Sequence, residues 1–390
     1  MNKLSLKYNI LYALSTIFYY AGYCIMIGYI SVYLLSQGLT NTKIGLILAL
    51  SQVLSVIIQP LLINFIEKYY HAKVRIPLLQ LVSCVLILSF ILFCFHKNQV
   101  ILSLCVISIL ALVMAMMSLV NSLAFEYQEI HIVYGISRGL GSLAYALTSL
   151  LLGFLLKKYD ASLLPLLYLV DFIFLALVLM KYSYHEEIQF QKKEVQKKSS
   201  TIVFLKKYPF FTCFLVGEIF IFFNHTFINH FLIQIIRNLK GSSLEMSKAI
   251  FIASLVELPM MFLYNKINQK ISTNTLIKLA MFMFFIKHLI TFLASTISMI
   301  YFGQCFQIVA YALFIPASVY YVRENISKQD QLKGQALVTM SMTLAGIFSD
   351  LCGGFLIDLM SIKTVLLLAT LISFMGLLIS FYSFYLEESK

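Results

Sequence analysis

The chain contains few charged residues for its length. Of its 390 residues, only 12% are Asp, Glu, Lys or Arg, 61% are hydrophobic, and the mean hydropathy is +0.89. Soluble domains carry about 25% charged and about 45–50% apolar residues. This composition excludes a soluble protein, because so much apolar surface could not be kept away from water. The solvent around most of this fold must be lipid.

Sequence motifs of enzymes and of disulfide-rich proteins are also lacking. There is no phosphate-binding loop, no zinc-type cluster of His and Cys and no nucleophile elbow, so nothing suggests ATP coupling or an enzyme. The seven cysteines all lie inside apolar runs, without the spacing of a disulfide framework or a metal site. No small-residue cleavage site follows the basic start, so we expect a retained first helix rather than a signal peptide. We expect no metal and no cofactor.

Long apolar runs are what the chain has in abundance. A helix needs about 20 apolar residues to cross a bilayer, whereas the strands of a membrane barrel alternate over about 10. The runs are long and continuous, so we predict an all-α integral membrane protein with twelve transmembrane helices. The expected spans are 9–35, 43–66, 76–95, 99–125, 132–156, 160–181, 207–236, 246–265, 272–294, 297–322, 333–357 and 362–385.

One polar segment divides these runs into two equal sets. The residues from Lys181 to Lys207 include seven Lys and three Glu and no long apolar run. We therefore predict an N-terminal six-helix bundle at 1–181, a basic linker at 182–206 and a C-terminal six-helix bundle at 207–390. Two equal bundles joined by a cytoplasmic linker are typical of secondary transporters.

The distribution of basic residues predicts the orientation. About 19 of the 29 Lys and Arg fall in segments that are cytoplasmic if both termini are inside, which follows the positive-inside bias. The net charge of +12 therefore indicates membrane topology and attraction to anionic lipid rather than nucleic-acid binding. We expect a multi-pass protein of the cell membrane, a monomer, with the linker and both termini in the cytoplasm.

The two halves contain matching features in the same order. Pro60 and Pro259 lie near the ends of the second and eighth spans, Arg138 and Lys333 open the fifth and eleventh, and both of these spans end in Gly-Phe-Leu. Together these matches indicate two related six-helix bundles, as in carriers that rock one bundle against the other.

Polar residues inside the spans are the candidate functional residues, since a charge at bilayer depth costs about 2.5–3.5 kcal/mol on insertion scales. Arg138 and Tyr145 lie seven residues apart on one helix face, and a planar guanidinium beside an aromatic ring suits a polar, ring-shaped solute. The alternative is that Arg138 reaches the membrane interface and Tyr145 only packs.

The C-terminal half contains more such residues. Glu218, His225 and Asn229 lie on one stripe of the seventh span, which we expect to line a central pathway. Glu257, two residues before Pro259, is our first candidate for carrying a proton, because a lone buried carboxylate is neutral more readily than an exposed one. Lys287 and Asp350 lie at similar estimated depth, so we predict that they form a charge pair. Gln304 and Gln307 lie on one polar face of the tenth span. Glu218, Asp171 and Asp350 are further candidates for carrying a proton.

Several segments resemble a known family. YGISRGLGSLAY at 134–145 and QPLLINFIEKYYHAK at 59–73 are similar to segments of the lactose-permease-like branch of the major facilitator superfamily, and VELPMMF and FIPASVYYV are similar to segments of less characterised relatives. The resemblance covers essentially the whole chain. It implies proton symport of a sugar or nucleoside, with Arg138 and Tyr145 at the solute.

The sequence also departs from that branch. Asn121 stands where the branch has an acidic residue that pairs with the Arg, and Lys287 replaces an Arg. Gln307 and Ala310 stand where the branch has the His and Glu used for proton coupling. Asn121 can still hydrogen-bond a hydroxyl group of the solute, but it supplies no charge.

These observations support a proton-coupled importer of a small polar solute such as a sugar, an oligosaccharide or a nucleoside. The solute would contact Arg138, Tyr145 and Asn121 in the first half, and His225, Asn229, Gln304 and Gln307 in the second. The alternative is an efflux carrier that exchanges amphipathic compounds for protons. A membrane sensor that transports nothing is a third possibility, but the chain offers no soluble signalling domain.

Overall fold

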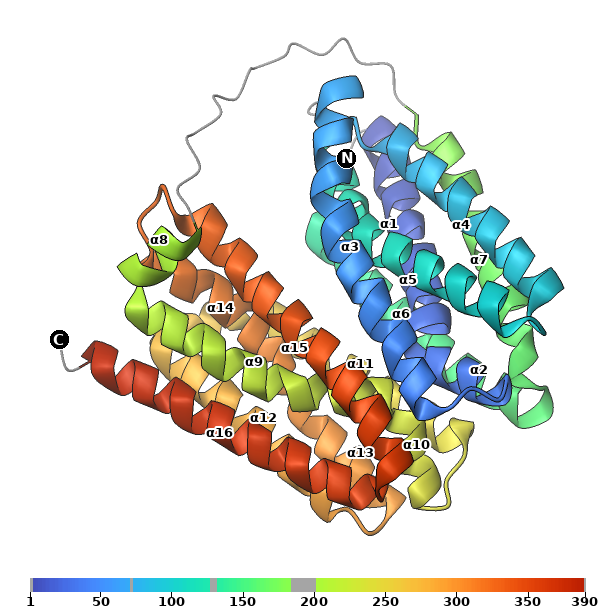
Figure 1. The fold of residues 1–390 in the computed structure, drawn as a ribbon. Coiled ribbons are helices and arrows are strands. Elements are labelled where there is room, and N and C mark those ends of the chain that lie inside the picture. Colours follow the sequence, from blue (N-terminus) through green and yellow to red (C-terminus); the bar gives the residue numbers. More distant parts are fainter. Residues whose placement is uncertain (1–2, 71–72, 127–131, 184–200, 389–390) are drawn as a thin grey trace. The chain divides into compact units, whose positions relative to one another are not determined.

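Helices make up the regular structure of this protein. The computed structural model describes residues 3–70, 73–126, 132–183 and 201–388, and all regular elements within these ranges are helical (Figure 1). The predicted linker falls mostly on residues 184–200, which lie outside the described residues. In chain order the helices are α1 (Lys3–Tyr23), η1 (Cys24–Gly28), α2 (Ile30–Ser36), α3 (Asn41–Tyr69), α4 (Arg75–Phe95), α5 (Gln99–Ser122), η2 (Leu123–Phe125), α6 (Tyr134–Lys158), η3 (Ala161–Leu163), α7 (Leu164–Lys181), α8 (Thr201–Lys207), α9 (Pro209–His230), α10 (Leu232–Asn238), α11 (Ser243–Asn268), α12 (Thr273–Leu293), α13 (Ile297–Cys305), η4 (Phe306–Ile308), α14 (Tyr311–Asn325), α15 (Gln331–Leu359) and α16 (Ile362–Glu388).

The helices confirm the prediction of an all-α membrane protein. Among the described residues, eleven helical segments are long and apolar enough to cross a bilayer, and α11 makes the number twelve if its bent parts form one span. The bend in α11 measures 49° and follows Pro259, which lacks the N–H that would bond to the preceding turn. Which side of the membrane the termini face stays a prediction.

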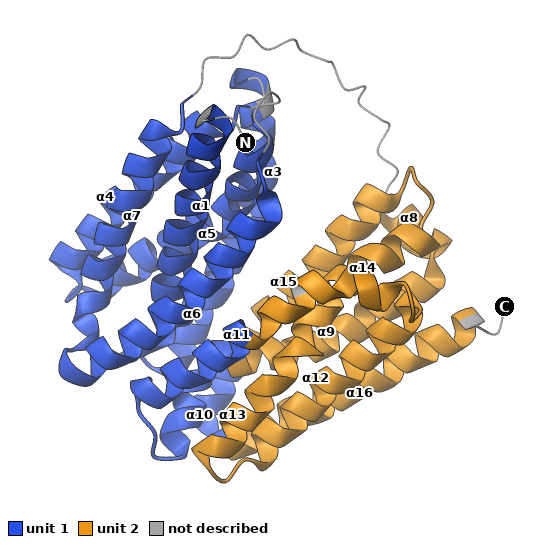
Figure 2. Ribbon diagram, turned by 180° about the vertical axis from the view of Figure 1, so that it is seen from behind, with its two compact units in different colours: residues 1–184, 229–255, 350–362 blue, residues 185–228, 256–349, 363–390 orange. Residues whose placement is uncertain are grey.

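The described chain forms two compact units (Figure 2). Unit 1 comprises residues 1–184, 229–255 and 350–362, and unit 2 comprises residues 185–228, 256–349 and 363–390. Unit 1 therefore contains the predicted first bundle together with α10, the first part of α11 and the last part of α15. The division into two bundles at the linker stays a prediction.

In unit 1 the first span is interrupted. A π-helical turn, Cys24–Gly28, separates α1 from α2, although the sequence predicted one continuous helix at 9–35. π-Helical turns of this kind often occur at functional sites because they re-aim neighbouring side chains. Around this turn, α1 packs on α6 and α7, α3 packs on α5, and α4 packs on α5 and α7.

In unit 2 the tenth span is interrupted as well. The helix breaks into α13, the 3₁₀ turn η4 and α14, with Ala310 outside the helical region at φ −85° and ψ −90°. α12 packs against all three pieces. A core of aromatic side chains surrounds this packing, including Phe214, Phe222, Phe284, Phe314 and Tyr321.

The outer face of α16 indicates contact with lipid. Leu371, Met375, Leu378 and Tyr382 are each more than half exposed and recur every three or four residues. This spacing places them on one stripe of the helix. Such a stripe would be unfavourable in water and is favourable in a bilayer.

Candidate functional site

Unit 2 contains a row of three side chains from three helical elements that are joined by hydrogen bonds. Lys287 of α12 donates from Nζ to Oε1 of Gln307 in η4 over 2.5 Å. Gln307 in turn donates from Nε2 to Oε1 of Glu257 in α11 over 2.9 Å. One amide therefore connects a buried ammonium group to a carboxylate.

Burial explains why these three side chains are joined by hydrogen bonds. Lys287 has no exposed surface and Gln307 is 5% exposed, while Glu257 is half-buried. An isolated charge in a low-dielectric interior costs several kcal/mol. The amide of Gln307 offers an acceptor to the ammonium and a donor to the carboxylate at the same time. The break at η4 supplies the geometry, because Gln307 sits in the irregular turn between α13 and α14.

Aromatic and imidazole rings lie beside this row of side chains. The ring of His225 in α9 stacks on Tyr311 with centroids 5.4 Å apart and planes 18° apart. The same imidazole meets the edge of Phe284 at 5.0 Å. His288, next to Lys287 on α12, shares a hydrogen bond with Ser373 through Nδ1 at 2.7 Å. Unit 2 thus combines two charged groups, two imidazoles and an aromatic stack.

The N-terminal candidate residue Arg138 lies over an aromatic ring of α1. Its guanidinium carbon is 4.3 Å from the ring centroid of Tyr20 in α1, and its Nη1 donates to Ser142 Oγ over 2.8 Å. A guanidinium over an aromatic face gains about 0.5–2 kcal/mol, more when it is removed from water. Tyr145 lies near Tyr23 instead, with ring centroids 6.4 Å apart. Tyr20 is therefore the ring that the sequence analysis missed.

Two predicted amide ligands have buried oxygen atoms that no described residue satisfies. They are Oδ1 of Asn121 in α5 and Oε1 of Gln304 in α13. A buried carbonyl oxygen without a donor costs about 1–3 kcal/mol. Each oxygen can therefore accept a hydrogen bond from a donor that the described residues do not supply. Asn229, by contrast, is exposed at the end of α9.

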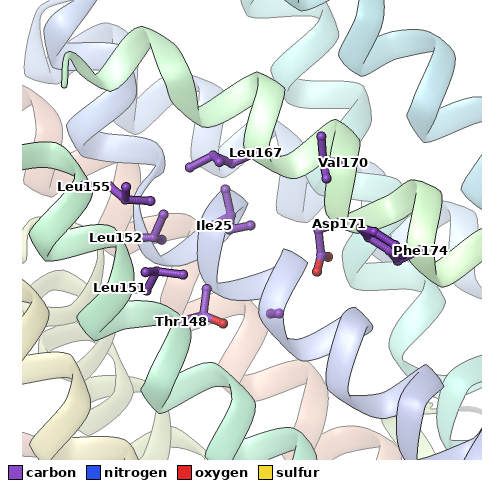
Figure 3. A pocket seen from close by; sticks show the side chains of 10 residues that line it. Ile25, Thr148, Leu151, Leu152, Leu155, Leu167, Val170, Asp171 and Phe174 are labelled. Carbon is purple, nitrogen blue, oxygen red and sulfur yellow. The ribbon is translucent and has the colours of Figure 1, made fainter.

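The proton-carrier candidates do not share one environment. Glu218 is fully buried and accepts a hydrogen bond from Ser341 Oγ over 2.6 Å. Asp171 lines a crevice of about 230 Å³ between α1, η1, α6 and α7 (Figure 3). Thr148 is the other polar side chain there, and the remaining lining residues are apolar.

Asp350 and Lys287 have partners other than each other. Asp350 Oδ1 lies 2.7 Å from His230 Nδ1, and its Oδ2 accepts from Gln52 Nε2 over 2.5 Å. Lys287 donates to Gln307. These partners lie within the unit of each residue, Asp350 in unit 1 and Lys287 in unit 2. The predicted charge pair of Lys287 with Asp350 would join the two units and stays a prediction.

No set of three or more His, Cys, Asp or Glu side chains among the described residues is arranged to hold a metal ion. The polar groups within each unit are of types that form hydrogen bonds and exchange protons.

Comparisons with known proteins agree with this chemistry. Residues 7–368 match the model of the MFS_1 like family. A mutant form of the nucleoside transporter NupG has a similar structure, with a TM-score of 0.83 and 12% identity over 97% of this chain and 100% of that one. A bacterial homologue of the human lysosomal transporter Spinster, inward-facing and unoccupied, gives a TM-score of 0.65 and 11% identity over 98% and 96% of the two chains. No curated protein matches the chain in sequence. The chain therefore belongs to the MFS_1 like family and is a major facilitator secondary transporter rather than an enzyme.

Proposed function

We propose that this transporter imports a small polar solute, a nucleoside or a sugar, together with a proton across the cell membrane. The observation that carries the proposal is the chain from Lys287 through Gln307 to Glu257. It joins a carboxylate that can take a proton to an amide that can bind a solute. Coupling needs such a connection, because proton binding must change the preference for one conformation or for the solute.

The hydrogen bonds among Lys287, Gln307 and Glu257 suggest a specific coupling step. With Glu257 ionised, its carboxylate holds the N–H of Gln307, whose carbonyl oxygen holds Lys287. When a proton adds to a carboxylate oxygen of Glu257, that group becomes neutral and holds the amide less strongly. The amide of Gln307 is then free to turn toward a hydroxyl group or a ring nitrogen of the solute. Proton and solute binding thus support each other.

The aromatic groups support a ring-shaped solute. His225 stacked on Tyr311 forms one flat surface, and Tyr20 under Arg138 forms another. Bases stack on such rings with about 1–3 kcal/mol each. The similarity to a nucleoside transporter adds weight to a nucleoside. We therefore favour nucleosides over oligosaccharides as the first solutes to test.

Uptake into proteoliposomes tests this proposal. Purified protein is reconstituted, a pH gradient is imposed, and labelled uridine, adenosine and lactose are offered with and without a protonophore. We expect accumulation of a nucleoside that the protonophore abolishes. Accumulation at the full rate without any proton gradient would refute proton symport.

A pair of carboxylate variants locates the coupling residue. Glu257→Gln should lose accumulation driven by the gradient but keep exchange of solute for solute, which requires no net proton movement. Glu324→Gln is the matched control, because Glu324 lies in unit 2 at the end of α14 and bonds to Thr273. If Glu218→Gln uncouples transport and Glu257→Gln does not, the proton carrier is Glu218.

A second candidate function is favoured by the crevice at Asp171. Its walls are apolar and several of its residues, such as Leu151 and Phe174, are about half exposed on the outside of the helices. One carboxylate in such a crevice is suited to an amphipathic cation, which would indicate proton-coupled export. Susceptibility of a deletion strain to lipophilic amines, with and without Asp171→Asn, distinguishes this function from import.

A further inference from the structure

Three polar or small positions on one face of α15 meet three positions on α3 in unit 1. Asp350, Gly354 and Asp358 are spaced four residues apart, so they share one helix face. They meet Gln52, Gly45 and the pair Asn41–Thr42 on α3 in reverse order along that helix, so the two helices pair antiparallel.

Asp358 closes the outermost contact. Its Oδ1 accepts from the backbone N of Asn41 over 3.2 Å and from Nδ2 of the same residue over 2.8 Å. Its Oδ2 accepts from the backbone N and the Oγ1 of Thr42, both over 2.7 Å. These N–H groups form the first turn of α3, where free donors and the helix dipole both attract a carboxylate.

Glycines make the middle contact. A side chain at Gly354 would overlap the backbone carbonyl of Asn41, and one at Gly45 would overlap the carbonyl of Asp350. The two backbones are therefore in direct contact, as glycines permit between membrane helices. So close a contact leaves no room for a solute between α3 and α15.

The innermost contact has a different chemistry. Asp350 is fully buried, and its two oxygens are held by His230 of α9 and Gln52 of α3. Ser31 of α2 donates to the backbone carbonyl of His230, which fixes that residue from a third element. Among the described residues, the ion pair that Asp350 and His230 form is with each other.

We propose that Asp350 and His230 form a proton-operated latch that keeps α3, α9 and α15 together at the end of these helices predicted to face outside, and that a proton taken up from outside opens it. This inference rests on the proposed proton-coupled import and names the group that regulates access to its site. Asp358 is a second fastening whose strength does not depend on the same proton.

The strength of the contact between Asp350 and His230 depends on how many protons the two side chains hold. With one proton between them, the imidazolium and the carboxylate attract each other at 2.7 Å in a buried setting. A second proton on the carboxylate removes its charge and leaves an imidazolium without a counterion. An uncompensated buried charge is costly, so this state favours separation of the helices and entry of water. If protonation opens the outer end, the transporter binds the proton before the solute or together with it.

Distance measurements between spin labels test the latch without any transport. Labels are placed on Ser36→Cys, the last residue of α2, and on Ser361→Cys, after α15, in a chain whose seven native cysteines have been replaced. Double electron–electron resonance in lipid nanodiscs is recorded from pH 8 to pH 5. We expect a short distance at high pH and a growing population of a longer distance as the pH falls.

Matched carboxylate variants identify the responsible group. Asp350→Asn should show the long distance at every pH and lose the pH response, whereas Asp358→Asn should increase the long population equally at all pH values and keep the response. A pH response that survives unchanged in Asp350→Asn overturns the proposal. If that variant does not fold, His230→Gln replaces it, and the midpoint of the response should then move by about 1–3 pH units. An unmoved midpoint also overturns the proposal.

The test separates this inference from the proposed function. A latch that opens with pH in a protein without proton-driven uptake would leave the latch standing and refute symport. Proton-driven uptake with a distance that ignores pH would support symport and refute the latch.

Discussion

Loss of the Gln307 side chain should destabilise unit 2. Gln307→Ala removes both the acceptor of the Lys287 ammonium and the donor to the Glu257 carboxylate. A hydrogen bond to a charged group contributes about 1.5–3 kcal/mol, and breaking a buried charged contact costs about 3–5 kcal/mol. Because Lys287 is fully buried and Glu257 only half-buried, we expect a loss of about 3–5 kcal/mol in the free energy of unfolding.

A double-mutant cycle isolates the coupling. Lys287→Met removes the buried ammonium and leaves the carbonyl oxygen of Gln307 without a donor, at a cost of about 1–3 kcal/mol. Once the ammonium is gone, the removal of Gln307 no longer strands it. The double variant should therefore be more stable than the sum of the single effects predicts, by about 2 kcal/mol.

Equilibrium unfolding in dodecyl sulfate, followed by far-ultraviolet circular dichroism, measures the three variants. The chain contains no Trp, so tryptophan fluorescence is not an option. Gln335→Ala is the control for Gln307→Ala, because the Gln335 amide donates to an uncharged group, the backbone carbonyl of Val319. Its effect should add to that of Lys287→Met within about 0.3–0.5 kcal/mol. If the effects of Gln307→Ala and Lys287→Met also add within this range, the hydrogen bonds that join Lys287, Gln307 and Glu257 do not contribute as argued.

Three further variants test other parts of the structure. Burial raises the pKa of Glu126, beside the backbone N–H of Arg75, from 4.5 to about 7, so the folded state should lose about 1–3 kcal/mol of stability as the pH rises from 5 to 8. Glu126→Gln keeps an acceptor for that N–H and should flatten this dependence in thermal unfolding; an equally steep curve contradicts the assignment. Gly217→Val forces a side chain against Ser380 and the backbone carbonyl of Gly376 on α16, so it should reduce the yield of monodisperse protein in size exclusion. A normal yield would show that α9 and α16 separate readily. Arg138→Lys keeps the charge but loses the planar group over Tyr20. The apparent affinity for the transported solute, measured from the concentration dependence of its thermal shift, should therefore fall about tenfold. An unchanged affinity would remove Arg138 from the solute site.

The helices were predictable because membrane insertion depends on local composition. Each span needs an apolar run, and the run is visible without knowledge of its neighbours. The breaks within spans were less visible. Proline is a known cause of helix bending, as at Pro259 in α11, but nothing in the composition near Gln307 distinguishes the turn η4 from continued helix.

The polar residues were predictable as individuals and not as partners. Glu257, Gln307 and Lys287 stood out because polar groups are rare in such runs, yet the bonds among them join three elements distant in sequence. Gln52 and His230 were missed, although an amide inside the apolar run ALSQVLSV is a signal of the same kind. Its importance becomes visible only beside Asp350.

From the sequence alone follow the solvent of this protein, its helical class, its approximate spans and the list of its costly polar groups, because these depend on the free energy of moving each residue into lipid. The tertiary structure decided which groups meet. It joined Lys287 to Glu257 through Gln307, set Arg138 on Tyr20 and paired Asp350 with His230. The physical reason is that spacing along a helix determines depth and relative direction on that helix, whereas a hydrogen bond between helices depends on their mutual rotation, which only the packing of the whole unit determines.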